Sequence, residues 1–146
     1  MIVVTAAIIE NAGLILAARR GKGKHLAGFW EFPGGKLEND ESPENCLARE
    51  LKEEFDVDVS VGAFFDESTH DYGDKVIRLL AYKVTLNSGE LKLIDHDKII
   101  WLAPEYLGSV KWAPADIPLV EKYQSALLKE HSVNAEPHCN ETGNRG

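Results

Sequence analysis

Apolar residues cluster into short runs separated by turn residues, a pattern that predicts several β-strands. Two runs at residues 2–9 and 14–19 flank Asn11-Ala12-Gly13, and Asn and Gly accept the positive φ angles that tight hairpin turns require. We therefore predict a β-hairpin, followed by a short aromatic strand at Trp30-Glu31-Phe32 that stops at Pro33. Further strands are predicted at residues 57–61, 64–68, 76–86 and 99–102, with turns at residues 72–74 and 87–89.

Two segments have the spacing of amphipathic helices. The first begins at Ser42-Pro43, because serine can cap free helix amides and proline fits the first helical position. Leu47, Leu51 and Phe55 then recur every four residues and give one apolar stripe, so this helix is predicted to end near Phe55. The second helix is predicted from about residue 117 to Lys129. Strands together with two separated helices indicate the α/β class, as a sandwich built on a mixed β-sheet.

Composition is typical of one soluble globular domain, since 44% of the 146 residues are hydrophobic and 27% are charged. We assign this domain to residues 1–129 and expect residues 130–146, which are polar, to form a flexible tail. The net charge of −8 disfavours passive binding to nucleic acid or to an anionic membrane. Cys46 and Cys139 suggest no disulfide framework, and the apolar N-terminus is too short to span a bilayer, so we expect a cytoplasmic protein.

The strongest chemical signal lies between Gly34 and Glu54. Glu50, Glu53 and Glu54 are at positions i, i+3 and i+4, so a helix directs their carboxylates to one face. Taken alone, such a pattern is more often a solvated acidic face than a site for a hard divalent cation such as Mg²⁺ or Mn²⁺. Here, however, Gly34-Gly35 can expose a backbone carbonyl and Lys36 can bind phosphate. Together these residues favour a site for metal and phosphate.

The same residues resemble the Nudix box, the signature of the Nudix hydrolase family. Gly35 is followed after five residues by Glu41, and after seven more by Arg49-Glu50-Leu51-Lys52-Glu53-Glu54. The box usually has glycine at the end of this helix, where the present chain has Asp56. Because Asp is among the few other residues that tolerate a left-handed conformation, we expect this departure to affect stability slightly and metal binding not at all.

The resemblance extends beyond the box. Ala17 to Arg20, Trp30 to Gly35 and Trp112 to Pro118 look like segments of the MutT-like nucleoside triphosphate pyrophosphohydrolases, particularly their CTP pyrophosphohydrolase branch. The likeness covers roughly residues 2–128. It implies a Nudix-type α/β/α sandwich in which Mg²⁺, or alternatively Mn²⁺, assists the cleavage of a nucleoside triphosphate into a monophosphate and pyrophosphate. The sequence leaves open whether the protein is a monomer or a homodimer.

The resemblance also implies roles for individual residues. The three glutamates of the helix become metal ligands, joined by a carbonyl of Gly34-Gly35, and Glu50 becomes the base that activates water. Arg49 orients these carboxylates, and Glu41 contacts them without binding the metal. Asp95 lies where MutT-like enzymes often carry a glutamate that reaches the metals, although an ordinary polar loop explains it equally well.

Arg20, Phe32, Lys36 and Asp116 are the candidate substrate-binding residues. Arg20 and Lys36 can hold phosphate, and Phe32 can stack on the base, although core packing is the alternative for such an aromatic residue. Asp116 precedes a helix and can also be its cap. In the family this region faces the base, where a carboxylate, being only an acceptor, pairs with the amine edge of cytosine or guanine and discriminates against uracil and thymine.

The predicted function is that of a magnesium-dependent nucleoside triphosphate pyrophosphohydrolase. Its expected role is to remove 8-oxo-dGTP, or CTP, dCTP and modified cytosine nucleotides, from the nucleotide pool. Removal of pyrophosphate from the 5′ end of an RNA is an alternative, which the basic loop Gly21 to His25 supports and the net charge disfavours. A third alternative is a non-catalytic nucleotide sensor, and the retained carboxylates argue against it.

Overall fold

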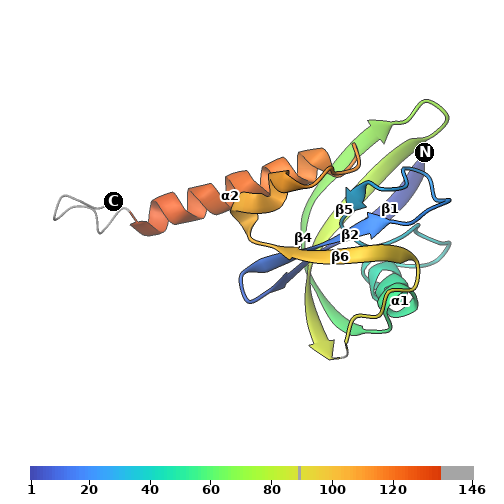
Figure 1. Ribbon diagram of the computed structural model, residues 1–146, viewed down its shortest axis with the longest axis horizontal. Coiled ribbons are helices and arrows are strands. Elements are labelled where there is room, and N and C mark those ends of the chain that lie inside the picture. The colour runs from blue at the N-terminus through green and yellow to red at the C-terminus, as the bar shows by residue number, and fades with distance from the viewer. Residues whose placement is uncertain (89, 136–146) are drawn as a thin grey trace.

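The computed structural model describes residues 1–88 and 90–135 and contains a single mixed β-sheet (Figure 1). The strand order is β3-β2-β1-β5-β4, and β6 pairs with β2. β1 and β5 run parallel, while the other pairs are antiparallel, so the predicted mixed sheet and the N-terminal hairpin are confirmed. The strands are β1 (Ile2–Asn11), β2 (Leu14–Arg20), β3 (Trp30–Glu31), β4 (Asp58–Asp71), β5 (Val76–Ser88) and β6 (His96–Leu102).

Helix α1 (Pro43–Phe55) covers one face of the sheet. Its start follows the prediction, because the Ser42 hydroxyl accepts a hydrogen bond from the Asn45 amide at 3.1 Å. At its end Asp56 has the expected left-handed conformation, with φ 56°. The Asp56 carboxylate also pairs with Lys52 at 3.3 Å and with Lys92 at 3.2 Å. These two ion pairs hold the helix end where the Nudix box has glycine.

The opposite face of the sheet is covered by α2 (Ile117–Ala135) and by the 3₁₀ helix η1 (Pro104–Ser109). Alternation along β1 supplies both cores, since Ala6 and Ile8 pack in the cluster that contains α2 residues, whereas Ala7 and Ile9 pack in the cluster that contains α1 residues. The result is the α/β/α sandwich that the sequence predicts.

Several predicted boundaries differ from the structure, and the turn predicted at residues 87–89 was wrong in part, because β5 continues through Asn87 to Ser88. β4 is one continuous strand, and register shifts between Val61 and Asp66 lie where two strands were expected. β6 begins at His96 rather than at residue 99. Helix α2 continues to Ala135, so the first six residues of the segment that we expected to be a flexible tail are helical. Residues 136–146, and Gly89 of a predicted turn, lie outside the described residues.

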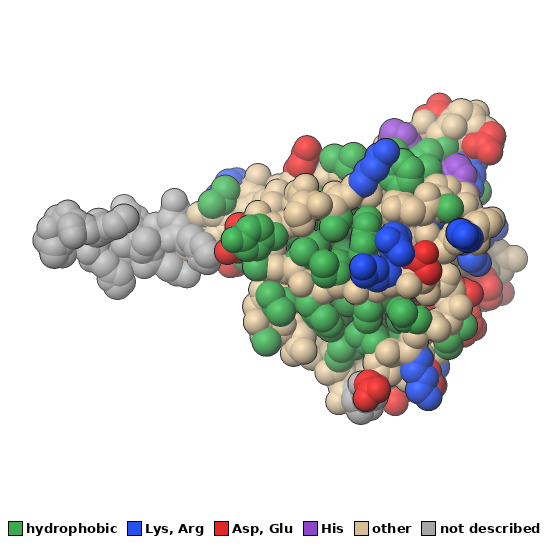
Figure 2. All heavy atoms as spheres, in the orientation of Figure 1, with side chains coloured by type: hydrophobic (Ala, Val, Ile, Leu, Met, Phe, Trp, Pro, Cys, Tyr) green, Lys and Arg blue, Asp and Glu red, His purple; other side chains and the backbone are tan. Residues whose placement is uncertain are grey.

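Acidic and basic side chains are interspersed over the face shown in Figure 2, around an area of hydrophobic side chains, and several acidic ones gather at the right-hand edge, on the side where α1 lies. No helix in the described ranges is both long enough and apolar enough to cross a membrane.

The two halves of the sheet separate at one end of β1, and this separation positions the candidate site. β1 and β2 pair only next to their turn, through Glu10–Ile15 and Asn11–Leu14. Farther along, β1 pairs instead with the segment after β3, because the amides of Thr5 and Ala7 donate to the carbonyls of Gly35 and Pro33. The glycine segment is thereby fixed beside the sheet, facing the end of β2.

Candidate active site

A cavity of about 260 Å³ lies at the end of β1 where the sheet separates. Its wall includes the glycine segment, the ends of β1 and β2, the C-terminal half of α1, the loop before β6 and the loop before α2. The predicted residues that line it are Arg20, Phe32, Gly34, Gly35, Lys36, Glu54, Asp95 and Asp116. The fold therefore brings together predicted residues, Arg20 and Asp116, that are 96 positions apart in the sequence.

Gly34 and Gly35 permit an approach that no other residue allows. A Cβ atom added to Gly34 would lie 2.0 Å from the Thr5 carbonyl oxygen, and one added to Gly35 would lie 2.1 Å from Cδ of Glu50. The Gly35 carbonyl accepts the Thr5 amide at 2.8 Å. Since successive carbonyls of an extended segment point to opposite sides, the Gly34 carbonyl points away from β1. Of the two predicted carbonyls, that of Gly34 is the better placed to bind a ligand.

Arg49 holds three carboxylates at the outer edge of the site. Its Nε and Nη2 donate to the two oxygens of Glu41 at 2.7 and 3.0 Å, and its Nη1 donates to Glu50 at 3.1 Å and Glu53 at 3.2 Å. The hydrogen bonds from Arg49 lower the pKa of Glu41 to about 2. Glu50 lies against Gly35, and burial raises its pKa, whereas the Glu53 side chain is 58% exposed. The three helix glutamates thus do not converge on one point; two of them meet at Arg49.

Glu54 is the helix glutamate that lines the cavity. Its Oε1 atom is buried and has no hydrogen-bond partner among the described residues. Burial, followed by the nearby negative charge of Glu31, raises the pKa of Glu54 to about 9. A buried carboxylate without a partner is unfavourable, so this position calls for a ligand with positive charge.

Glu31 and His96 form a part of the site that the sequence analysis missed. His96 Nε2 lies 2.7 Å from Glu31 Oε2, and Arg20 Nη1 donates to Glu31 Oε1 at 2.8 Å. The imidazole of His96 is buried and stacks on Phe55, with ring centroids 5.3 Å apart. One sequence signal was available, since Glu31 is a charged residue between two aromatic residues in a short strand. Arg20 is therefore committed mainly to a carboxylate of the protein itself.

Asp116 is buried and lines the cavity from the loop before α2. Its Oδ2 accepts the amide of Phe32 at 3.0 Å, a contact across the fold rather than the helix cap that the sequence also allowed. Burial, and then the negative charge of Glu31, raise the pKa of Asp116 well above its usual range. Phe32 is itself buried and packs against Trp112 with ring centroids 4.7 Å apart, which agrees with its alternative role in the core.

A second cavity, also of about 260 Å³, adjoins the first. The two share Val4, Arg20, Glu31, Lys36, Leu79 and Asp116. The second has mostly apolar walls, which include Ile77, Tyr72 and Ala113, whereas Glu54 and Asp95 line only the first. We call them the apolar lobe and the carboxylate lobe. Asp116 lies where the two lobes meet, so one elongated, amphiphilic ligand can occupy both.

Comparisons with known proteins agree with this geometry. A NUDIX domain model matches residues 4–122. The chain is 41% identical over 125 residues to the CTP pyrophosphohydrolase of Escherichia coli K12, covering 86% of this chain and 93% of that protein. It is 43% identical over 84 residues to the 8-oxo-dGTP diphosphatase of Proteus vulgaris, covering 58% of this chain and 75% of that protein. The solution structure of the E. coli ORF135 protein matches with a TM-score of 0.77 and 38% identity, covering 88% and 92%. The chain therefore belongs to the Nudix family.

Proposed function

We propose that this protein is a magnesium-dependent nucleoside triphosphate pyrophosphohydrolase, which converts a (d)NTP into a (d)NMP and pyrophosphate. The observation that carries the proposal is the buried, unpartnered carboxylate oxygen of Glu54 in a cavity that also contains Lys36 and Asp116. A site with unpaired negative charge beside cationic side chains suits a metal–phosphate complex, which supplies both signs of charge.

The residues present fit a hard divalent cation. Nudix hydrolases generally use divalent metal ions, and Mg²⁺ prefers carboxylate and carbonyl oxygens. Glu54, Glu50 and the Gly34 carbonyl would hold it, with Asp95 and Glu53 reaching it from the rim. Among the described residues no three acidic, histidine or cysteine side chains already form a metal cluster, and Glu50 and Glu53 are hydrogen-bonded to Arg49. When bound, the cation would neutralise phosphate charge and acidify the attacking water.

The chain's own residues would then position the reactants. Glu50 accepts a proton from the attacking water, and the raised pKa that burial gives this carboxylate makes it a stronger base. The water oxygen forms a bond to phosphorus while the bridging oxygen between the α- and β-phosphates leaves, so the products are a monophosphate and pyrophosphate. Arg49 keeps Glu50 oriented through the 3.1 Å hydrogen bond, and Lys36 binds a phosphate oxygen.

Asp116 makes cytosine and guanine nucleotides the preferred substrates. Hydrogen bonds donated by the amine edge of either base stabilise the ionised form of Asp116 against the burial that raises its pKa, and the ionised carboxylate repels the carbonyl-rich edges of uracil and thymine. The relatives named CTP pyrophosphohydrolase and 8-oxo-dGTP diphosphatase agree with this pair of bases. A role in removing modified nucleotides from the pool follows from that preference.

The test is a substrate panel with purified protein and Mg²⁺, in which pyrophosphate release is measured from CTP, dCTP, 5-methyl-dCTP, dGTP and 8-oxo-dGTP, with UTP and dTTP as negative controls. We expect release from at least one cytosine or guanine nucleotide and little from the controls. An RNA with a 5′-triphosphate is included to compare the alternative substrate. Absence of pyrophosphate from every free nucleotide would refute the proposal.

A further inference from the structure

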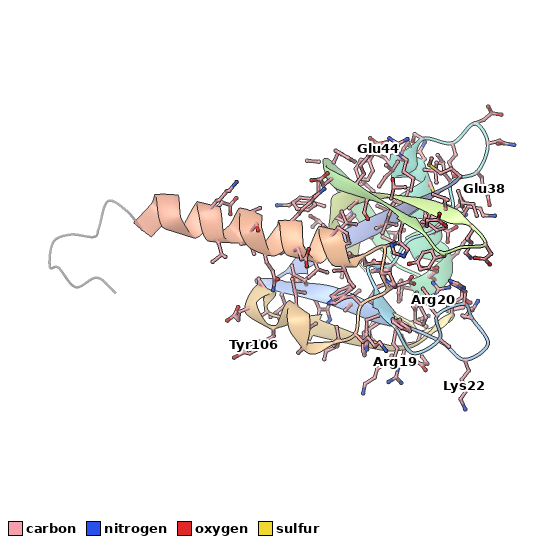
Figure 3. All side chains as sticks on the ribbon, turned by 90° about the horizontal axis from the view of Figure 1, so that it is seen from above. Arg19, Arg20, Lys22, Glu38, Glu44 and Tyr106 are labelled. Atoms are coloured by element: carbon pink, nitrogen blue, oxygen red, sulfur yellow. The ribbon has the colours of Figure 1, made fainter. Side chains whose placement is uncertain are left out.

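The loop between β2 and β3 contributes one lysine to the carboxylate lobe. Lys24 lines this lobe but not the apolar lobe, and Glu54 and Asp95 line the same lobe. The neighbouring Lys22 lines neither lobe, and Figure 3 shows its side chain extending away from the body of the molecule. The two lysines therefore share a loop and a charge but differ in their access to the cavity.

The backbone of this loop fixes the position of Lys24. Arg20 closes the loop through two hydrogen bonds, since its amide donates to the Phe29 carbonyl and its carbonyl accepts the Gly28 amide, each at 2.9 Å. Inside the loop, the Lys24 amide donates to the Gly21 carbonyl and the Lys24 carbonyl accepts the Ala27 amide, each at 3.2 Å. A closed loop of this kind costs little further ordering entropy when Lys24 binds a ligand.

Gly21 brings the loop against the segment before β6. This residue is buried, and a Cβ atom added to it would lie 3.1 Å from the Asp95 carbonyl oxygen. The close approach places Lys24 beside the Asp95 side chain, with Nζ 4.0 Å from Oδ1. Both side chains are 51% exposed, so this ion pair is long, screened by solvent and easily exchanged for another anion.

Lys24 and Lys36 are the cations of the carboxylate lobe whose ammonium groups have hydrogen-bond donors available for a ligand. Arg20, the third cation, is engaged by the Glu31 carboxylate and by the carbonyl of His25. In the described part of the chain, Lys36 has no ion pair or side-chain hydrogen bond, and Lys24 has only the 4.0 Å contact with Asp95. Lys36 comes from the glycine segment and Lys24 from the β2–β3 loop, so they reach the lobe from two different elements.

We propose that Lys24 binds the pyrophosphate end of the nucleotide, its β- and γ-phosphates, and so contributes to selection of triphosphates. The inference rests on the proposed function for the identity of the ligand. Asp116 and the apolar lobe take the base, so the phosphate chain extends into the carboxylate lobe, where Lys24 donates charge-assisted hydrogen bonds to the phosphates that leave. Because the monophosphate product lacks these two phosphates, its binding does not depend on Lys24.

The test compares Lys24→Ala with the matched control Lys22→Ala in the full chain. Binding of inorganic pyrophosphate and of CMP, each with Mg²⁺, is measured by isothermal titration calorimetry. Loss of one charge-assisted contact weakens binding roughly tenfold, so we expect Lys24→Ala to raise the Kd of pyrophosphate roughly tenfold and to leave that of CMP unchanged. Lys22→Ala should change neither, and Lys24→Arg should restore pyrophosphate affinity.

Turnover gives an independent measurement. With a triphosphate substrate, Lys24→Ala should raise KM more than it lowers kcat, and its thermal unfolding should match the wild-type protein because the side chain is half exposed. Equal pyrophosphate affinity in the two alanine variants, an equal loss for CMP, or no pyrophosphate binding by the wild-type protein would overturn the inference. If the wild-type protein binds pyrophosphate through Lys24 but hydrolyses no nucleotide, the proposed function fails while the role of Lys24 stands.

Discussion

The carboxylates around Arg49 and those inside the cavity differ in what neutralises their charge. Glu41, Glu50 and Glu53 share one guanidinium with contacts of 2.7–3.2 Å, and the pKa of Glu41 is lowered. In the cavity, burial raises the pKa values of Glu54 and Asp116. Each carboxylate of the Arg49 group has a guanidinium donor within hydrogen-bond distance, whereas the buried Oε1 atom of Glu54 in the cavity has no partner among the described residues.

This difference distinguishes residues that position the site from residues that we expect to bind a ligand. A guanidinium with five donors can hold several carboxylates in fixed directions, so the Arg49 group positions Glu50 against the glycine segment. A buried carboxylate without a partner raises the free energy of the folded protein until a cation or proton neutralises it. The cavity group therefore favours ligand binding at the expense of stability.

The largest effect is expected from Glu54→Gln, which removes the unpartnered charge from the cavity. Turnover should fall roughly 10³-fold, since loss of a metal ligand costs several kcal/mol of transition-state stabilisation. Without metal at pH 8, the same variant should be more stable to urea by about 1 kcal/mol or more, because the wild-type protein must keep a proton on Glu54 that the unfolded chain releases. Steady-state kinetics and urea denaturation with EDTA measure the two quantities.

Two further variants of α1 are the controls for this experiment. Glu53→Gln changes a mostly exposed side chain that we propose as a metal ligand, so turnover should fall without a gain in stability; retained activity would remove Glu53 from the proposed metal site. Glu44→Gln, at an exposed position in the first turn, should change neither quantity by much. A Glu54→Gln protein that is less stable than the wild type would contradict the view that this carboxylate is strained.

Arg49→Lys should come next, because a lysine cannot reproduce the forked contacts to Glu41 and Glu50. We expect a loss of stability, since the Arg49 side chain is only 27% exposed and Glu41 loses its paired contacts of 2.7 and 3.0 Å. Turnover should fall roughly a hundredfold, because Glu50 is no longer oriented. Wild-type kcat in this variant would show that Glu50 needs no positioning by Arg49.

The pH dependence of stability provides a smaller and more specific test. The pKa of Glu54 rises from an ordinary value of 4.5 to about 9 in the folded protein, so between these values the folded protein holds a proton that the unfolded chain has released. This group therefore lowers the stability of the metal-free protein as pH increases from 5 to 8. This decrease in the free energy of unfolding with rising pH should be absent in Glu54→Gln, and Mg²⁺ should reduce it in the wild-type protein. Urea denaturation at several pH values measures it.

The smallest effect is expected from Asp56→Gly, which restores the usual residue of the box. Glycine relieves the left-handed strain at φ 56°, but the exposed ion pairs with Lys52 and Lys92 are lost. These terms oppose each other, so stability should change by less than about 1 kcal/mol, and kcat should stay within about twofold of wild type because no cavity residue is touched. A large loss of activity would show that the C-terminal end of α1 is needed for catalysis.

Local patterns were sufficient to predict most secondary structure. The hairpin at Asn11-Ala12-Gly13, the cap at Ser42 and the end of α1 at Asp56 each depend on neighbouring residues, so short segments of sequence contain the necessary information. The break expected within β4 was wrong, because pairing along the whole of β5 holds the strand together through its bulges. The extension of α2 to Ala135 shows that a polar segment can continue a helix that is already formed.

The sequence by itself determined the family, through the spacing from Gly35 to Glu54, and the chemistry that this spacing allows. Only the tertiary structure decided which carboxylates have a cationic hydrogen-bond partner and which have none. Arg49 divides the helix glutamates between the rim and the cavity, and contacts such as Glu31–His96 and Phe32–Asp116 join residues 65 and 84 positions apart. Charge compensation depends on distance and burial, which arise from the packing of remote segments, so no local pattern of residues can specify it.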